Sequence, residues 1–150
     1  MMKKSNLTIL SLVAVIAISI SSCCCSKKAI NSGRSLEATA WKLVTLNGEA
    51  NKKFAESDRF TMKFNNADST YSGVAACNRF FGKFEMKKNG VIDIHAGAST
   101  MMACPNMELE RPLLLMLDEA DKYKIENGKL ILYKGGAKVA EFAPYAATVN

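Results

Sequence analysis

Short segments in which apolar and polar residues alternate fill most of the chain beyond residue 40. One of them reads Phe-Thr-Met-Lys-Phe, the period-two pattern of a strand with one buried face. Pairs such as Asn-Gly and Gly-Gly separate these segments and favour tight turns. The pattern predicts about eight strands. They span Trp41–Leu46, Phe60–Phe64, Thr70–Val74, Arg79–Met86, Val91–Ile94, Tyr123–Ile125, Leu130–Tyr133 and Val139–Phe142.

The period changes to a helical one in a single segment. Leu109, Leu113 and Leu117 lie four residues apart, and Met116 and Ala120 fall on the same face. This spacing predicts one helix with an apolar stripe. A small curled antiparallel sheet of about eight strands that wraps around this helix, or closes into a barrel, is the fold class expected, an α+β domain.

Two boundaries depend on weaker signals. Pro112 lacks a backbone N–H, so we predict a first helical turn at Asn106–Glu110 followed by a kink. A helix that starts near Arg111 would instead place the proline at the tolerated first position. The polar stretch Glu49–Asp58 is expected to be a loop.

The N-terminus has the features of a bacterial export signal. Met1–Ser22 combines a basic start with an apolar run, and that run is short for a membrane span. It ends in Ile-Ser-Ser before Cys23, which resembles the lipobox of bacterial lipoproteins. The resemblance implies cleavage before Cys23, lipidation of its thiol, and a membrane-anchored protein. The outer membrane, facing the periplasm, is the default location.

Segment 23–37 follows as a lipidated N-terminus and polar linker, and the domain is expected at 38–150. Cys24 and Cys25 are open to three fates: free thiols, a mutual disulfide or further modification. Removal of the leader lowers the formal net charge from +6 to +4, because Lys3 and Lys4 leave with it. This mild excess and the lack of basic runs argue against nucleic-acid binding, and we expect a monomer.

Cys77 and Cys104 are candidates for a disulfide, since exported proteins form such bonds. The closure would stabilise the domain by roughly 3–4 kcal/mol. Two buried free thiols remain the alternative, because the sequence does not give the distance between the two α-carbons.

No other group has the pattern of a catalytic or metal site, so no cofactor is predicted. His95 lacks a nucleophile partner at a catalytic spacing, and we expect it to be exposed or structurally hydrogen-bonded. Zinc requires four ligands, and this domain has two cysteines and one histidine. The carboxylates of Asp118, Glu119 and Asp121 lack EF-hand spacing and are expected to be solvated.

The segment Ser72–Phe84 concentrates glycine, aromatic residues and one cysteine. Its two glycines, Gly73 and Gly82, suit bends or bulges in a curled sheet. Asn78 suits a turn, because asparagine readily bonds nearby backbone groups. A buried position is expected for the apolar side chains here and in the later methionine pair: Phe80, Phe81, Phe84, Met101 and Met102.

These residues resemble the META domain family, which includes the HslJ-like bacterial lipoproteins. The match covers about Ala38–Pro144 and rests on two segments, Cys-Asn-Arg-Phe and Thr-Met-Met-Ala-Cys, together with Glu110 before the helix. The resemblance implies a small barrel-like α+β fold, frequent lipid anchoring and an association with envelope stress, without an established catalytic set. The signature residues are Gly73, Asn78, Arg79, Phe80, Gly82, Thr100 and Met102.

Three functions are compatible with these features. The first is a non-enzymatic, lipid-anchored envelope protein with a structural or binding role, alone or with an envelope protein partner. The second is a barrel that holds an apolar ligand or peptide between sheet and helix, which would need a pocket of ~300 Å³ or more. The third is an inhibitor of an envelope hydrolase. Any binding surface is expected where Ser72–Phe84 and Ser99–Cys104 meet.

Overall fold

The structure is a computed structural model that describes residues 34–50, 52–56 and 58–146. The predicted leader Met1–Ser22, the lipobox residue Cys23 and its neighbours Cys24 and Cys25 lie outside the described residues. Within them, no helix has both the length and the apolar character needed to cross a membrane.

Nine strands form one antiparallel sheet. Their order is β6-β5-β4-β3-β1-β9-β8-β7, with β2 paired to β1. The first strand therefore lies between the two runs of consecutive hairpins and joins them. The strands are β1 (Ala40–Leu46), β2 (Glu49–Ala50), β3 (Phe60–Asn65), β4 (Thr70–Ala75), β5 (Asn78–Met86), β6 (Ile92–Ser99), β7 (Lys122–Glu126), β8 (Lys129–Lys134) and β9 (Ala137–Tyr145).

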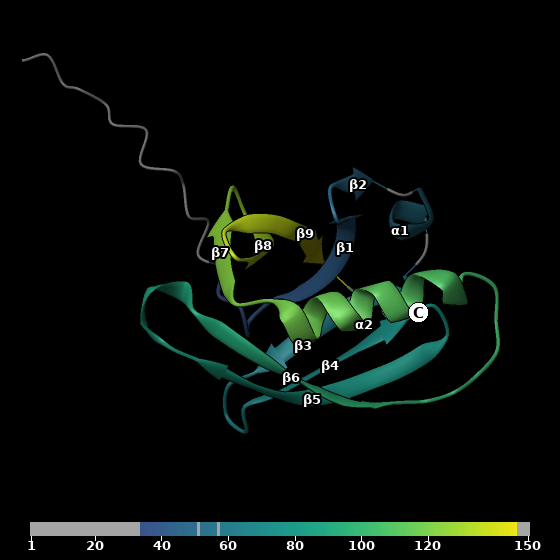
Figure 1. Cartoon of the computed structure of the whole chain (residues 1–150), viewed down its shortest axis with the longest axis horizontal. Helices are drawn as coiled ribbons and strands as arrows, with labels where there is room; N and C mark the ends of the chain where they lie inside the picture. The colour runs from purple at the N-terminus through teal and green to yellow at the C-terminus, as the bar shows by residue number, and fades with distance from the viewer. Residues whose placement is uncertain (1–33, 51, 57, 147–150) are drawn as a thin grey trace, which may run out of the picture.

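The sheet curls into a nearly closed barrel. Its two end strands approach where Val91 bridges Lys122 and where the Ile92 N–H donates to the Asp121 carbonyl oxygen at 3.1 Å. Helix α2 (Glu110–Glu119) connects β6 to β7 and lies between the two halves of the sheet (Figure 1). The predicted class, a small antiparallel sheet or barrel with one principal helix, is confirmed.

The helix begins differently from the prediction. A 3-10 turn, η2 (Met107–Leu109), precedes α2, and Pro112 is the third residue of the α-helix. Backbone N–H groups in a first turn have no intrahelical acceptor, so proline is tolerated there and the predicted kink is unnecessary. The apolar stripe is confirmed, because Leu113, Met116 and Leu117 are all buried.

The prediction of a loop at Glu49–Asp58 is wrong. This stretch contains β2 and a short helix, α1 (Lys52–Glu56). The helix buries Phe54, whose ring meets the Phe60 ring edge-on with centroids 5.1 Å apart. A single large apolar residue in a polar run is enough to dock the helix, although it is too little to create a periodic pattern.

The interior is filled by the protein's own side chains. Trp41, Phe60, Phe64 and Leu117 are all buried, so side chains occupy the space between sheet and helix that the ligand-binding barrel would require. The Trp41 indole N–H donates to the carbonyl oxygen of Leu36 at 2.9 Å. Leu36 is itself buried, so the packed domain begins before residue 38, inside the expected linker.

Two glycines make room for aromatic rings inside the barrel. A Cβ on Gly73 would lie 2.2 Å from the Thr61 carbonyl oxygen and 2.4 Å from the Phe80 ring. A Cβ on Gly82 would lie 2.6 Å from the Tyr71 ring. Gly82 also lies at the register shift between β5 and β6, where three steps of β6, from His95 to Ala98, oppose two steps of β5, so the extra residue is on β6. The Phe80 and Tyr71 rings thus occupy the space that a side chain at Gly73 or Gly82 would need.

Candidate functional site

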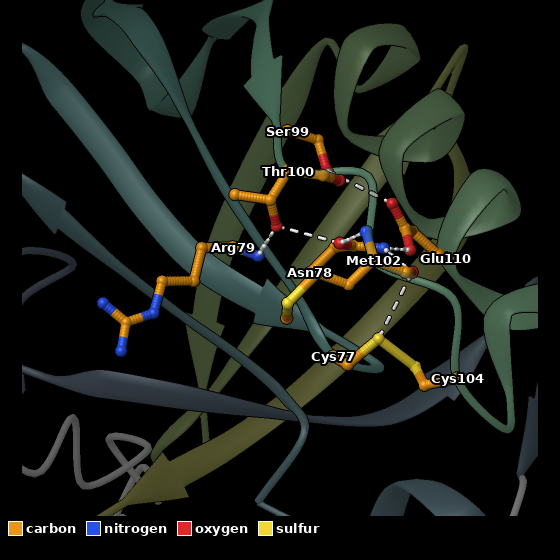
Figure 2. Close-up of a disulfide and its surroundings, with 8 residues drawn as sticks. All are labelled: Cys77, Asn78, Arg79, Ser99, Thr100, Met102, Cys104 and Glu110. Atoms are coloured by element: carbon orange, nitrogen blue, oxygen red, sulfur yellow. Dashed lines mark hydrogen bonds between the residues drawn. A yellow bond between two sulfur atoms is a disulfide. The ribbon is translucent and has the colours of Figure 1, made fainter.

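A disulfide joins the two cysteines of the domain. Cys77 lies in the two-residue turn between β4 and β5, and Cys104 lies between β6 and η2. Their sulfur atoms are bonded, with the α-carbons 6.3 Å apart. The bond fastens the β4–β5 turn to the chain segment that leads into the helix (Figure 2).

Asn78 lies beside the disulfide and is 1% exposed. Its Oδ1 accepts hydrogen bonds from the Met102 backbone N–H at 2.7 Å and the Thr100 hydroxyl at 2.8 Å. Its Nδ2 donates to the Met102 carbonyl oxygen at 3.1 Å and to Glu110 Oε2 at 2.6 Å. A carboxamide has two donors and two acceptor sites, so this side chain is completely satisfied.

Further bonds extend this network at both ends. Thr100 Oγ1 accepts from the Arg79 backbone N–H at 3.1 Å, and the Thr100 N–H donates to the Arg79 carbonyl oxygen at 3.0 Å. Ser99 Oγ lies 3.2 Å from Glu110 Oε1. The helix is thus tied to β5 and β6 by its first residue (Figure 2). We call this group the clasp: Cys77, Asn78, Ser99, Thr100, Met102, Cys104 and Glu110.

The clasp is built to hold chain segments together. Both oxygens of the Glu110 carboxylate have hydrogen-bond partners, and the Asn78 amide has no remaining capacity. No histidine of the described residues belongs to the clasp. Its chemistry is therefore that of a hydrogen-bond network around one buried amide plus a covalent bond, which together set the position of the helix.

The remaining candidate residues lie elsewhere. His95 is on β6, half-exposed, with Nδ1 3.7 Å from Asp93 Oδ1. Among the described residues, no three His, Cys, Asp or Glu side chains gather as metal ligands would. Glu119 forms an ion pair with Lys134 at 2.8 Å, and Asp121 accepts from the Gly135 N–H at 2.6 Å.

Tyr71 is the inward-facing aromatic residue next to Gly82. Its hydroxyl donates to the His95 carbonyl oxygen at 3.0 Å. Burial raises the pKa of Tyr71 above its ordinary 10.0, and the negative charge of Asp118 raises it further. The phenol therefore stays protonated and acts as a donor across the β4–β6 wall.

The prediction of a buried aromatic and methionine group is wrong in part. Phe80 and Phe84 are buried, whereas Phe81 is 58% exposed, Met101 97% and Met102 53%. Neighbours on a strand point to opposite faces, so Phe81 must face outward when Phe80 faces inward. The methionines lie in a segment without regular structure, where no periodicity fixes which side chains are buried.

Two clasp residues belong neither to the predicted signature set nor to the predicted disulfide. Ser99 and Glu110 complete the network around Asn78, although the sequence marks Ser99 only as the start of the second signature segment and Glu110 only as the acidic residue ahead of the helix. Asn78 and Glu110 are 32 residues apart. No local pattern links positions at that distance, so the sequence shows each residue without showing the bond.

Solved structures similar to this chain share its fold. The NMR structure of a protein from Burkholderia xenovorans is 18% identical, with a TM-score of 0.58, and the match covers 79% of this chain and 88% of that one. The crystal structure of a DUF4847 family protein from Bacteroides vulgatus is 18% identical, with a TM-score of 0.55, and the match covers 72% of this chain and 93% of that one. A search among curated proteins finds no match.

The family model of the META domain matches residues 34–146. This range contains the whole barrel, the disulfide and the clasp, and it begins before the buried Leu36. The chain belongs to the META domain family.

Proposed function

We propose that this protein is a lipid-anchored component of the bacterial cell envelope whose META domain has a non-enzymatic, structural or binding role linked to envelope stress. The observation that carries the proposal is the Cys77–Cys104 disulfide. Such bonds persist in oxidising compartments, which agrees with the export signal and lipobox ahead of the domain. The protein would be a monomer tethered to the outer membrane and facing the periplasm.

The non-enzymatic role is supported by how the clasp uses its polar groups. Asn78 and Glu110 are the buried or half-buried polar residues at the point where the two signature segments meet, and their bonds are made within the protein. An enzyme site would need reactive groups directed toward a substrate. A stably fastened barrel whose outer surface meets a partner fits the arrangement better.

Mass spectrometry of the mature N-terminal peptide tests the anchor. We expect a chain that begins at Cys23 and carries acyl groups, and multiple chains would hold it on the membrane almost permanently. A Cys23→Ser variant serves as the control and should keep its leader. An unmodified Cys23 in the wild type, or a wild-type chain that retains Met1, would contradict the proposal.

Affinity capture from envelope extract tests the binding role. The full chain should retain a specific envelope protein that a Cys77→Ser variant, with its clasp opened, retains less well. Sensitivity of a strain that lacks the protein to envelope-damaging agents tests the link to stress. Turnover of an envelope substrate by the purified protein would overturn the non-enzymatic assignment.

A further inference from the structure

The outer face of the β3–β4–β5 wall is hollowed by the sizes of its side chains. Because side chains alternate across a strand, the residues opposite the buried ones share the outer face. In register across β4 and β5, Val74 pairs with Arg79, Ser72 with Phe81 and Thr70 with Lys83. The middle strand thus presents small side chains beside a row of large ones, which creates a trough along β4.

The trough is large enough for a ligand. One hollow has a volume of about 370 Å³ and is lined by Thr61, Lys63, Ser72, Val74, Phe81 and Tyr145, among others. A second hollow of about 450 Å³ continues past Phe81 toward Lys83 and His95. Phe81 separates the two and is 58% exposed. Its ring is therefore available to a bound apolar group.

The charged side chains that line the trough are cations. Lys63, Arg79 and Lys83 line it, and none of them forms an ion pair with another described residue. No carboxylate of the described residues lines either hollow, although Asp58 bonds the lining residue Tyr145 at one end and Asp93 Oδ1 lies 3.7 Å from Nδ1 of the lining residue His95 at the other. Glu85 and Asp93 are register partners on β5 and β6 just beyond Lys83, at the end of the basic stretch. The trough thus favours an anionic ligand.

Arg79 connects the trough to the clasp. Its backbone N–H and carbonyl group both bond to Thr100, which fixes the strand at this point. Its side chain points away from the disulfide and from Glu110 (Figure 2). The side chain of this signature residue therefore does not contact the clasp, whereas its backbone bonds to the clasp residue Thr100.

We propose that the trough binds an extended acidic peptide segment of a partner protein, in which an apolar residue lies between two acidic ones. Arg79, Phe81 and Lys83 are spaced two residues apart, about 6.6 Å per step along a strand. An extended peptide has the same spacing, so acidic, apolar and acidic side chains at alternate positions would meet these three in turn. The inference rests on the proposed binding role and is independent of the lipid anchor.

The open shape of the trough decides between a peptide and a lipid chain. An acyl chain gains affinity when a site removes most of its apolar surface from water, and a trough on the face of a sheet leaves one side wet. An extended peptide keeps its outward side solvated without loss. The cations on both sides of Phe81 also match two separated carboxylates better than one headgroup.

Fluorescence anisotropy with a labelled peptide that repeats Asp-Ser-Leu-Ser tests the proposal. The protein is the full chain in nanodiscs of zwitterionic lipid. We expect saturable binding that weakens as salt is added. A peptide that repeats Lys-Ser-Leu-Ser, and one in which serine replaces leucine, should bind at least about tenfold more weakly, which corresponds to 1.4 kcal/mol.

Variants of the protein locate the site. Phe81→Ala should weaken binding about tenfold, as loss of a central aromatic anchor does. Arg79→Ala and Lys83→Ala should each weaken it about two- to fivefold, the range of an exposed ion pair. Lys88→Ala, an exposed lysine on the β5–β6 turn, is the matched control and should bind like the wild type. All three trough residues are exposed, so thermal unfolding should be unchanged.

Equal binding of the acidic and basic peptides would overturn the proposal, as would trough variants that bind as tightly as the Lys88→Ala control. If the peptide does not bind, self-association that depends on Phe81 would overturn the proposal in favour of a second copy of this chain. Capture by phosphatidylglycerol vesicles that depends on Phe81 would, in the same case, overturn it in favour of a lipid surface. None of these failures affects the mass spectrometric test of the anchor.

Discussion

The two faces of β5 do different work within one strand. Its inward residues Asn78, Phe80 and Phe84 are buried and connect the clasp to the core. Its outward residues Arg79 and Phe81 are exposed, and their side chains line the trough. The inward face is satisfied by contacts within the domain, whereas the outward face presents a ring and a cation to solvent.

Along β5, residues that stabilise the fold therefore alternate with residues that are free to contact a partner. A change on the inward face removes packing or hydrogen bonds that the barrel requires. A change on the outward face of the same strand leaves those contacts in place. The family signature therefore combines residues of both kinds, and mutations at neighbouring positions should have separable effects.

The largest predicted difference is between alanine substitutions at two adjacent positions of β5, one on each face. Phe80→Ala should lower the free energy of unfolding by about 3–5 kcal/mol, because a buried ring is lost and the space beside Gly73 is left empty. Phe81→Ala should change it by less than about 0.5 kcal/mol. Urea unfolding followed by tryptophan fluorescence measures both. Similar losses in the two variants would contradict the division.

Opening the disulfide should have the next largest effect. Replacement of Cys77 and Cys104 by serine should destabilise the domain by roughly 3–4 kcal/mol, because the unfolded chain is no longer cross-linked. The urea midpoint measures the loss, and dithiothreitol should lower the wild-type midpoint to that of the variant. A reductant that leaves the wild-type midpoint unchanged would argue against the bond.

Removal of the central amide tests the clasp without touching the sulfur atoms. Asn78→Ala should lower the free energy of unfolding by about 1–3 kcal/mol, because the Met102 N–H and one Glu110 oxygen lose their partner. Asn66→Ala, in the exposed β3–β4 turn, is the matched control and should be nearly neutral. Equal stability of the two variants would mean that water replaces the amide.

Eight of the nine strands were predictable in outline because apolar and polar residues alternate along them, whereas β2 and the part of β6 after Ile94 were not predicted. Phe60–Phe64 shows its buried face directly, and the structure assigns β3 to Phe60–Asn65. The same rule applied to two adjacent phenylalanines would have placed Phe81 outside the barrel, since Phe80 and Phe84 share the inward face. Alternation along the strand therefore predicts that Phe81 is exposed, whereas the expectation of a common aromatic core does not.

The clasp and the first helix required three-dimensional contacts. Glu110 meets Asn78 only because β5, β6 and α2 converge, and neither residue carries a local sign of the other. Helix α1 depends on the docking of Phe54 against Phe60. Tertiary packing overrides weak local propensity in such short segments, so a polar sequence gave no reason to expect a helix.

The outer face of β8 and β9 provides a contrast to the trough. There, the Glu141 carboxylate accepts from Lys129 at 2.6 Å and from Lys138 at 2.8 Å. These two hydrogen bonds, that of Lys129 first, lower the pKa of Glu141 below its ordinary 4.5. Charges on this face are paired within the protein, whereas the trough cations form no ion pair with a described residue.

Glu141→Gln should therefore have the smallest effect, about 0.5 kcal/mol less stability at pH 7. Because the folded pKa is lowered, the contribution is present above pH 4.5 and disappears as pH falls through the folded value. Urea midpoints of variant and wild type should converge in acid and in high salt. A difference that persists below the folded pKa would mean that the side chain acts by packing, and the outer face would then share the inner face's role.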